Sequence, residues 1–143
     1  MEVLKYRSEI FAYFVLFIIG ALGYMGIELL WRGYSHWSMG IAGGLCFFIF
    51  GILWSKVSLL PKIYFPIIGA LIITLIELIF GIFFNIILKK NIWDYSNLPF
   101  NFLGQISLSY TTAWGFLSII FFPLAGKLKI LLTGIFLNAF SYK

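Results

Sequence analysis

The sequence is poor in charge: of its 143 residues only 10% are Asp, Glu, Lys or Arg, whereas 62% are hydrophobic. Soluble domains are roughly a quarter charged, so this composition places the chain in a membrane. The apolar runs are long and do not alternate, which argues against a barrel of alternating strands and for helices. We therefore predict an all-α fold, a polytopic transmembrane helix bundle with four to five spanning helices.

Cysteine and histidine are almost missing as well, with Cys46 and His36 the single examples of each. One cysteine excludes an intrachain disulfide, and one histidine makes a zinc site a poor fit. The net charge of +5 comes from single or paired basic residues at the ends of apolar runs, where they anchor helices. The sequence therefore predicts no metal, no cofactor and no nucleic-acid partner.

The apolar runs predict one integral-membrane domain, residues 1–143, with helices at about residues 10–30, 39–54, 63–88, 103–125 and 128–140. The first run is too long for a signal-peptide core and lacks a cleavage site, so we expect it to be retained. The last run is short for a span, and we favour a tilted fifth helix over an interfacial or re-entrant segment.

Glycines mark the faces on which we expect helices to pack closely. Gly40, Gly44 and Gly51 share one face of the second helix, and Gly20 and Gly23 are expected to act similarly on the first. Small residues at such spacings let helix backbones approach each other in a membrane.

Glu77 is the most informative polar residue, because it lies near the middle of the third expected helix. A charged side chain there costs about 2.5–3.5 kcal/mol, so it should face the bundle interior or a watery cavity. Thr74, Glu77, Gly81 and Asn85 are three, four and four residues apart and draw one stripe along the helix. The simpler alternative is a buried carboxyl that is hydrogen-bonded to a neighbouring helix.

A second polar stripe is predicted on the fourth helix, from Gln105, Ser109 and Thr112, with Trp114 deeper. Both stripes lead to the loop "NIWDYSNLPFNFLGQIS", residues 91–107, which is rich in polar and aromatic side chains. The alternative for this loop is a self-bonded turn whose Asp, Ser and Asn side chains cap backbone groups.

Glu28 and Arg32 lie four residues apart at the end of the first helix, where an ion pair lowers the cost of placing charge near hydrocarbon. Gly33 is a candidate helix terminator ahead of His36. Simpler interpretations are an interfacial ion pair for Glu28 and Arg32 and an aromatic-belt position for His36.

Two membrane crossings separate the loop after the first helix from the loop after the third, so both should emerge on one membrane face. The sequence therefore predicts a one-sided polar cavity that binds a small polar or amphipathic solute. We expect its substrate-binding residues to be Glu28, Arg32, His36, Trp37, Glu77, Asn85, Trp93, Asp94, Tyr95, Ser96, Asn97, Asn101 and Gln105.

Two other functions stay open at this point. Ser96, His36 and Asp94 are the residue types of a nucleophile, a base and an orienting acid, as a membrane-embedded enzyme acting on a lipid-like substrate would need. We favour a transporter over that enzyme and assign no catalytic residue. The third possibility is an accessory membrane subunit.

Three segments resemble a known family: "RGYSHWSMGIAGGLCF", "LIITLIELIFGIFFN" and "WDYSNLPFNFLGQISL". They are similar to the ABC-transporter type IV family of bacterial membrane proteins, the CmpB-like permeases. The resemblance implies a multi-pass permease of the bacterial cytoplasmic membrane. Because the chain has no nucleotide-binding motif, any ATPase would be a separate subunit, and the permease would work as an oligomer or with such partners. The family positions that match here are Arg32, His36, Trp37, Glu77, Trp93, Asp94, Tyr95, Ser96, Asn97, Pro99, Asn101, Gly104 and Gln105.

The shared membrane face can be tested by labelling single cysteines at Tyr34 and Ser96, in a chain whose Cys46 has been replaced. An impermeant thiol reagent should label both positions from the same side of sealed vesicles. Labelling from opposite sides would contradict the predicted topology.

Overall fold

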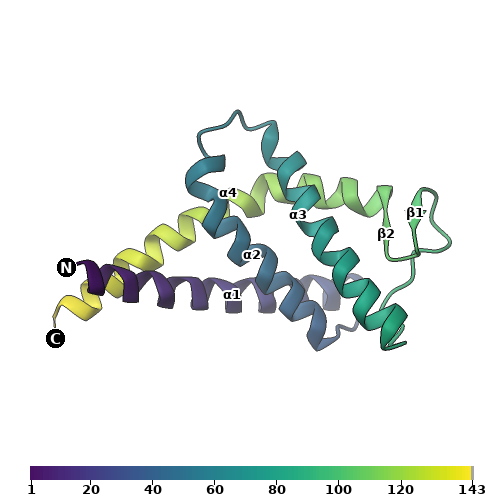
Figure 1. Ribbon diagram of the computed structural model, residues 1–143, viewed down its shortest axis with the longest axis horizontal. Coiled ribbons are helices and arrows are strands. Elements are labelled where there is room, and N and C mark those ends of the chain that lie inside the picture. The colour runs from purple at the N-terminus through teal and green to yellow at the C-terminus, as the bar shows by residue number, and fades with distance from the viewer. Residues whose placement is uncertain (143) are drawn as a thin grey trace. The chain divides into compact units, whose positions relative to one another are not determined.

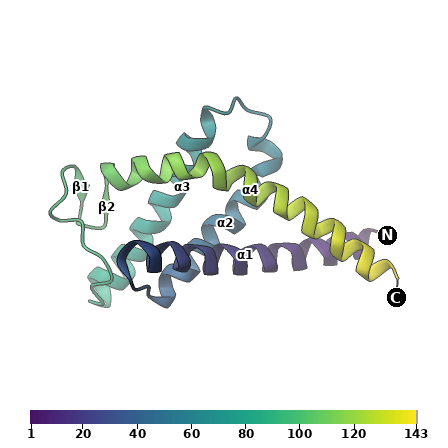
Figure 2. The same cartoon turned by 180° about the vertical axis from the view of Figure 1, so that it is seen from behind.

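The computed structural model describes residues 1–142 and is almost entirely helical (Figures 1 and 2). Its helices are α1 (Glu2–Arg32), α2 (Trp37–Val57), α3 (Tyr64–Phe80), the π-helix η1 (Gly81–Ile87) and α4 (Leu108–Ser141). Two short strands, β1 (Asn101–Phe102) and β2 (Ile106–Ser107), form an antiparallel hairpin ahead of α4.

Four helical segments in the described part of the chain are long and apolar enough to cross a membrane: Glu2–Arg32, Trp37–Val57, Tyr64–Ile87 and Leu108–Ser141. This confirms the predicted all-α polytopic architecture, at the lower of the two expected span counts.

Helix α4 differs from the sequence prediction. It is one continuous helix of 34 residues, where separate helices were expected at residues 103–125 and 128–140. Lysine does not break a helix, and Lys129 has a partner, since its Nζ lies 3.3 Å from Glu9 Oε1. At about 1.5 Å per residue, 34 residues reach roughly 51 Å, longer than a hydrocarbon core of about 30 Å. We therefore expect α4 to cross the membrane once and to extend beyond it.

The chain forms two compact units, each with its own packing. Unit 1 comprises Met1–Leu59 together with the residues from Phe121 on, and unit 2 comprises Leu60–Ile120. Unit 1 therefore contains α1, α2 and the second part of α4, whereas unit 2 contains α3, η1, the hairpin and the start of α4.

Close contact between α1 and α2 is the main packing feature of unit 1. A Cβ on Gly20 would lie 2.8 Å from the carbonyl oxygen of Gly43, and a Cβ on Gly43 would lie 2.9 Å from that of Gly20. Gly40, Gly44 and Gly51 likewise lie against side chains of α1. These contacts confirm the packing role predicted for the glycine face of α2.

The same prediction was wrong for Gly23, because nothing lies within 4 Å of the Cβ position there. Gly20 and Gly23 are three residues apart, so their Cβ directions differ by about 60° around the helix, and the close contact with α2 does not extend as far as Gly23. Gly20 faces α2 and Gly23 faces open space.

The two glycines provide a matched test of helix packing. Gly20→Ala should lower the free energy of unfolding by about 1–3 kcal/mol, because the new Cβ forces α1 away from α2. Gly23→Ala should be neutral, or stabilising by up to about 1 kcal/mol through its helix propensity. Thermal denaturation of both variants in one detergent would measure the difference, and equal midpoints would contradict it.

Candidate functional site

Glu77 is buried in unit 2, with 5% of its surface exposed. The Tyr95 hydroxyl donates to its Oε1 at 2.8 Å, and the Trp114 indole N–H donates to its Oε2 at 3.1 Å. Each oxygen of the carboxyl group therefore accepts a hydrogen bond from an aromatic side chain. One donor belongs to the loop and the other to α4, so Glu77 joins both to α3.

Aromatic and hydroxyl groups surround this carboxyl group. The ring of Tyr110 stacks on that of Tyr95, with centroids 4.4 Å apart and planes 12° apart. It also lies 6.2 Å from the nearer ring of Trp114. One turn before Glu77, the hydroxyls of Thr74 and Thr111 lie 3.0 Å apart. Carboxylate, phenol, indole and π-faces together form a site suited to a cationic group.

Asn85 fixes the other end of the same helical stripe. Its side-chain amide donates to the carbonyl oxygen of Trp93 at 3.0 Å and to Gln105 Oε1 at 2.8 Å, and it accepts from the Ile92 N–H at 2.7 Å. The indole N–H of Trp93 in turn donates to the Gln105 backbone carbonyl at 2.9 Å. Asn85, Trp93 and Gln105 are all buried, so this network holds both ends of the loop against η1.

Gly81, the remaining member of the stripe, lies close to the side chain of Gln105. A Cβ there would lie 2.7 Å from Gln105 Oε1, so a larger residue would displace the Gln105 side chain. Gly81 begins η1, a seven-residue π-helix. Short π-helical segments within α-helices are frequent at functional sites. All four members of the predicted stripe, from Thr74 to Asn85, therefore contact the loop or α4.

The loop also bonds to itself, as the self-bonded alternative predicted. Asp94 Oδ1 accepts from the backbone N–H of Ser96 at 2.8 Å and also from its hydroxyl. Asn101 donates to the carbonyl oxygens of Leu98, at 2.8 Å, and Ser96, at 3.2 Å, and accepts from the Gly104 N–H at 3.1 Å. These side chains give the loop a fixed shape.

The environment of Asp94 favours its charged form. The Ser96 hydroxyl, followed by the Ser96 backbone N–H, lowers the pKa of the Asp94 carboxyl below its ordinary value. The resulting stabilisation is present above the pKa of the unfolded chain and is lost as pH falls through the folded value.

The polar stripe predicted on the fourth helix was placed on the wrong face of that helix at Ser109 and Thr112. Ser109 and Thr112 are exposed, and the Thr112 hydroxyl bonds to the carbonyl oxygen of Leu108 in its own helix. The prediction counted from Gln105, but α4 begins only at Leu108. Trp114, which was predicted, does line the site, together with Tyr110 and Thr111 in place of Ser109 and Thr112. Thr111 and Tyr110, which the prediction missed, lie three and four positions before Trp114 and so share its helical face.

In unit 1, Glu28 forms the predicted ion pair with Arg32, at 2.7 Å between Oε1 and a guanidinium nitrogen. Glu28 also accepts from the Ser35 hydroxyl at 2.6 Å. The Arg32 guanidinium lies 4.5 Å from the ring centroid of Tyr34. Gly33 ends α1 in a left-handed conformation with φ of 78°. This cluster fixes the end of α1 and the turn that follows.

His36 caps the start of α2. Its Nδ1 accepts from the Ser38 backbone N–H at 3.3 Å and lies 2.7 Å from the Ser38 hydroxyl. Trp37 begins the helix, is largely exposed, and has its ring 5.3 Å from that of His36. The observed contacts of both residues are those of a capped helix start.

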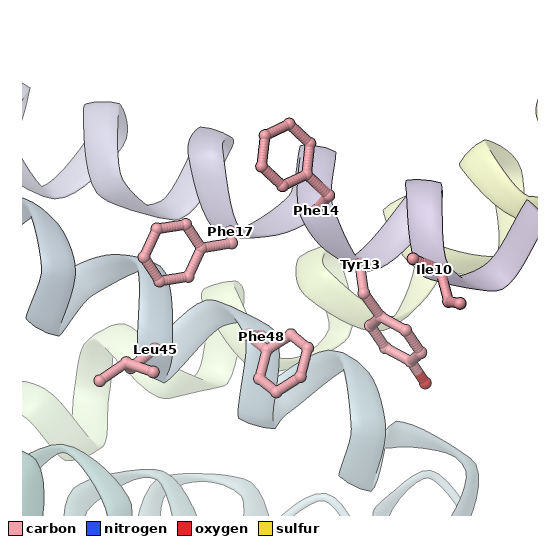
Figure 3. Close-up of a pocket in the computed structure, with 6 residues that line it drawn as sticks. All are labelled: Ile10, Tyr13, Phe14, Phe17, Leu45 and Phe48. Carbon is pink, nitrogen blue, oxygen red and sulfur yellow. The ribbon is translucent and has the colours of Figure 1, made fainter. Parts of the chain in front are cut away.

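Unit 1 also has a hollow of about 430 Å³ between α1 and α2 (Figure 3). It is lined by Ile10, Tyr13, Phe14, Phe17, Leu45 and Phe48. Its lining is almost entirely hydrocarbon, so it suits an acyl chain rather than a polar solute.

The predicted site residues fall into two groups, one in each unit. Glu28 and Arg32 lie together in unit 1, with His36 and Trp37 at the following helix start. In unit 2, Tyr95 contacts Glu77, while Trp93 and Gln105 contact Asn85. Asp94, Ser96 and Asn101 bond within the loop, and Asn97 is exposed in the same turn.

Asn85→Leu should loosen the loop, because three buried polar groups of residues 92, 93 and 105 would lose their partner. Each such loss costs about 1–3 kcal/mol. Leucine is similar in size and more apolar, so membrane insertion should not suffer. Hydrogen exchange across residues 91–107 should become at least tenfold faster, whereas Asn97→Ala, a change in the exposed turn, should leave it unchanged. Unaltered exchange in Asn85→Leu would contradict the anchoring role.

Comparison with known proteins identifies a family for the chain. No curated protein and no solved structure is similar to the chain. A family model described as "Putative ABC-transporter type IV" matches residues 11–137. The match covers α2, α3, the loop and most of α1 and α4, and so includes every residue of the Glu77 site. The chain is therefore a multi-pass, transport-related membrane protein, and it belongs to the ABC-transporter type IV family.

Proposed function

We propose that the chain is a permease component of the bacterial cytoplasmic membrane, and that its Glu77 site binds the cationic group of a small polar or amphipathic solute. The observation that carries the proposal is the buried carboxyl group inside a membrane span, hydrogen-bonded to Tyr95 and Trp114. An ionisable side chain at such a place is expensive, and function is the usual reason for it.

The chemistry of the site supports a cation. A carboxylate has about four acceptor positions and can bond to an ammonium or guanidinium group in addition to neutral donors. Tyr95, Tyr110 and Trp114 add aromatic faces, which attract cations strongly where water is excluded. Along the sequence, the basic residues of unit 2 lie at the ends of the span, at Lys62, Lys89 and Lys90.

The loop supports a role in controlling access. Tyr95 belongs to the loop and donates directly to Glu77, so a solute cation that takes this position must displace the Tyr95 hydroxyl. Solute binding would thereby be coupled to the contact between the loop and α3. Family membership supports a separate ATPase subunit as the energy source for such a cycle.

Binding can be tested with Glu77→Gln, which keeps the size of the side chain but removes its charge. The purified proteins would be placed in lipid nanodiscs with a defined mixture of small amines, guanidines, quaternary ammonium compounds, anions and neutral solutes. Wild-type protein should retain one or more cations, detected by mass spectrometry. Glu77→Gln should retain them at least tenfold less, as expected for a lost charge-assisted hydrogen bond of about 1.5–3 kcal/mol.

Glu2→Gln is the matched control, because it removes the same charge from an exposed position in the first turn of α1. It should retain the cations as wild type does. Equal retention by Glu77→Gln, or retention of anions or neutral solutes alone by wild type, would contradict the proposal.

A further inference from the structure

The hairpin that precedes α4 exposes large apolar side chains. Phe100 is 82% exposed, Phe102 56%, Leu103 57% and Leu108 56%. We call these four residues the hairpin patch. They surround β1 and β2 within nine consecutive residues of a loop that joins two spans. Loops in water are seldom so apolar, so this patch needs a covering partner.

The backbone holds the patch in its exposed arrangement. Phe100 and Leu103 both have φ of 53°, in the left-handed region that bulky residues rarely occupy. Asn101, which lies between them, fixes the turn through its bonds to the Leu98 carbonyl and the Gly104 N–H. Such strained conformations persist where surrounding contacts determine them, and they cluster at functional positions.

The charge pattern identifies the partner. Residues 95–126, which include the whole patch, contain no Asp, Glu, Lys or Arg. The last charge before them is Asp94, in the polar turn, and Lys89 and Lys90 precede it. Contact with headgroups and acyl chains is inexpensive for such an uncharged segment, whereas the flanking charged residues belong in water or among headgroups.

The patch is also followed along α4 by further exposed apolar residues. Leu108 belongs both to the patch and to the first turn of α4, a membrane span. Further along α4 within unit 2, Phe116, Ile119 and Ile120 are exposed apolar residues. Exposed apolar residues therefore continue from the hairpin into the span without an intervening charged residue.

We propose that the hairpin patch is immersed in the lipid bilayer, with Phe100, Phe102 and Leu103 at the boundary between headgroups and acyl chains. The exposed side chains of Asp94, Ser96 and Asn97 stay on the aqueous side, whereas Tyr95 between them reaches Glu77 in the span. The hairpin is then an interfacial anchor that sets the depth of the loop over the membrane span. This inference is independent of what Glu77 binds.

The test uses single cysteines at Phe100, Phe102 and Leu103, and at Asn97 as the exposed control in the same loop, in a Cys46→Ala background. Because these side chains are exposed, their replacement removes little packing. Each cysteine would carry an environment-sensitive NBD label, and the labelled protein would be reconstituted in phosphatidylcholine–phosphatidylglycerol vesicles. Quenching would be measured with lipids that carry a shallow nitroxide and with aqueous iodide.

The label at positions 100, 102 and 103 should emit at shorter wavelength, and nitroxide lipids should quench it severalfold more than the label at position 97. Iodide should show the opposite order. Strong quenching by iodide and weak quenching by nitroxide lipids at positions 100, 102 and 103, as at position 97, would place the hairpin in water and overturn the proposal. Protection of positions 100, 102 and 103 from both quenchers would overturn it in favour of a protein partner.

Discussion

A carboxyl group inside an apolar span has to be hydrogen-bonded, and this constraint organises unit 2. Glu77 meets it with one donor from the loop, Tyr95, and one from α4, Trp114. Satisfying a single buried acid therefore brings three separate segments of the chain together. Asn85 repeats the arrangement two turns later with three bonds of its own. Most side chains of this span are apolar and could pack against many surfaces. Glu77 and Asn85, by contrast, need particular hydrogen-bonding partners, and so they specify which residues of the loop and α4 lie next to the span.

The apolar runs were enough to predict the first three spans, and local periodicity predicted one polar face of α3. It predicted the Glu28–Arg32 pair as well, because both residues lie on one continuous helix. It was not enough for α4, whose phase depends on where the helix begins. That start follows the β1–β2 hairpin, and Gln105 just before it is held by Asn85, a residue 20 positions earlier in the sequence. Tyr110 and Thr111 were therefore missed and Ser109 and Thr112 wrongly chosen.

The loop shows a different limit of sequence reasoning. Asp94, Ser96 and Asn101 have the chemistry of ligand-binding residues, yet their observed bonds are to the loop itself. Residue type alone does not distinguish a side chain that binds a ligand from one that shapes a turn. The two kinds of side chain are distinguished by whether they are buried and by which residue they bond to. By these criteria Glu77 and Tyr95 stand out, because Tyr95 belongs to the loop but bonds to a buried acid rather than to the loop backbone.

The internal bonding of the loop bears on how Glu77 could become accessible. To unfold, the loop would have to break the buried hydrogen bonds of Asn85 and the exposed ones of Asp94 and Asn101. The Tyr95–Glu77 contact, by contrast, is one hydrogen bond from a hydroxyl at the end of a side chain, and a change of rotamer is enough to break it. Rotation of Tyr95 would also break its stacking on Tyr110, but it leaves the hydrogen bonds within the loop and those of Asn85 intact, so it is a cheaper route to the acid than loop opening. We expect the tyrosine side chain, rather than the loop backbone, to be the moving part of this site.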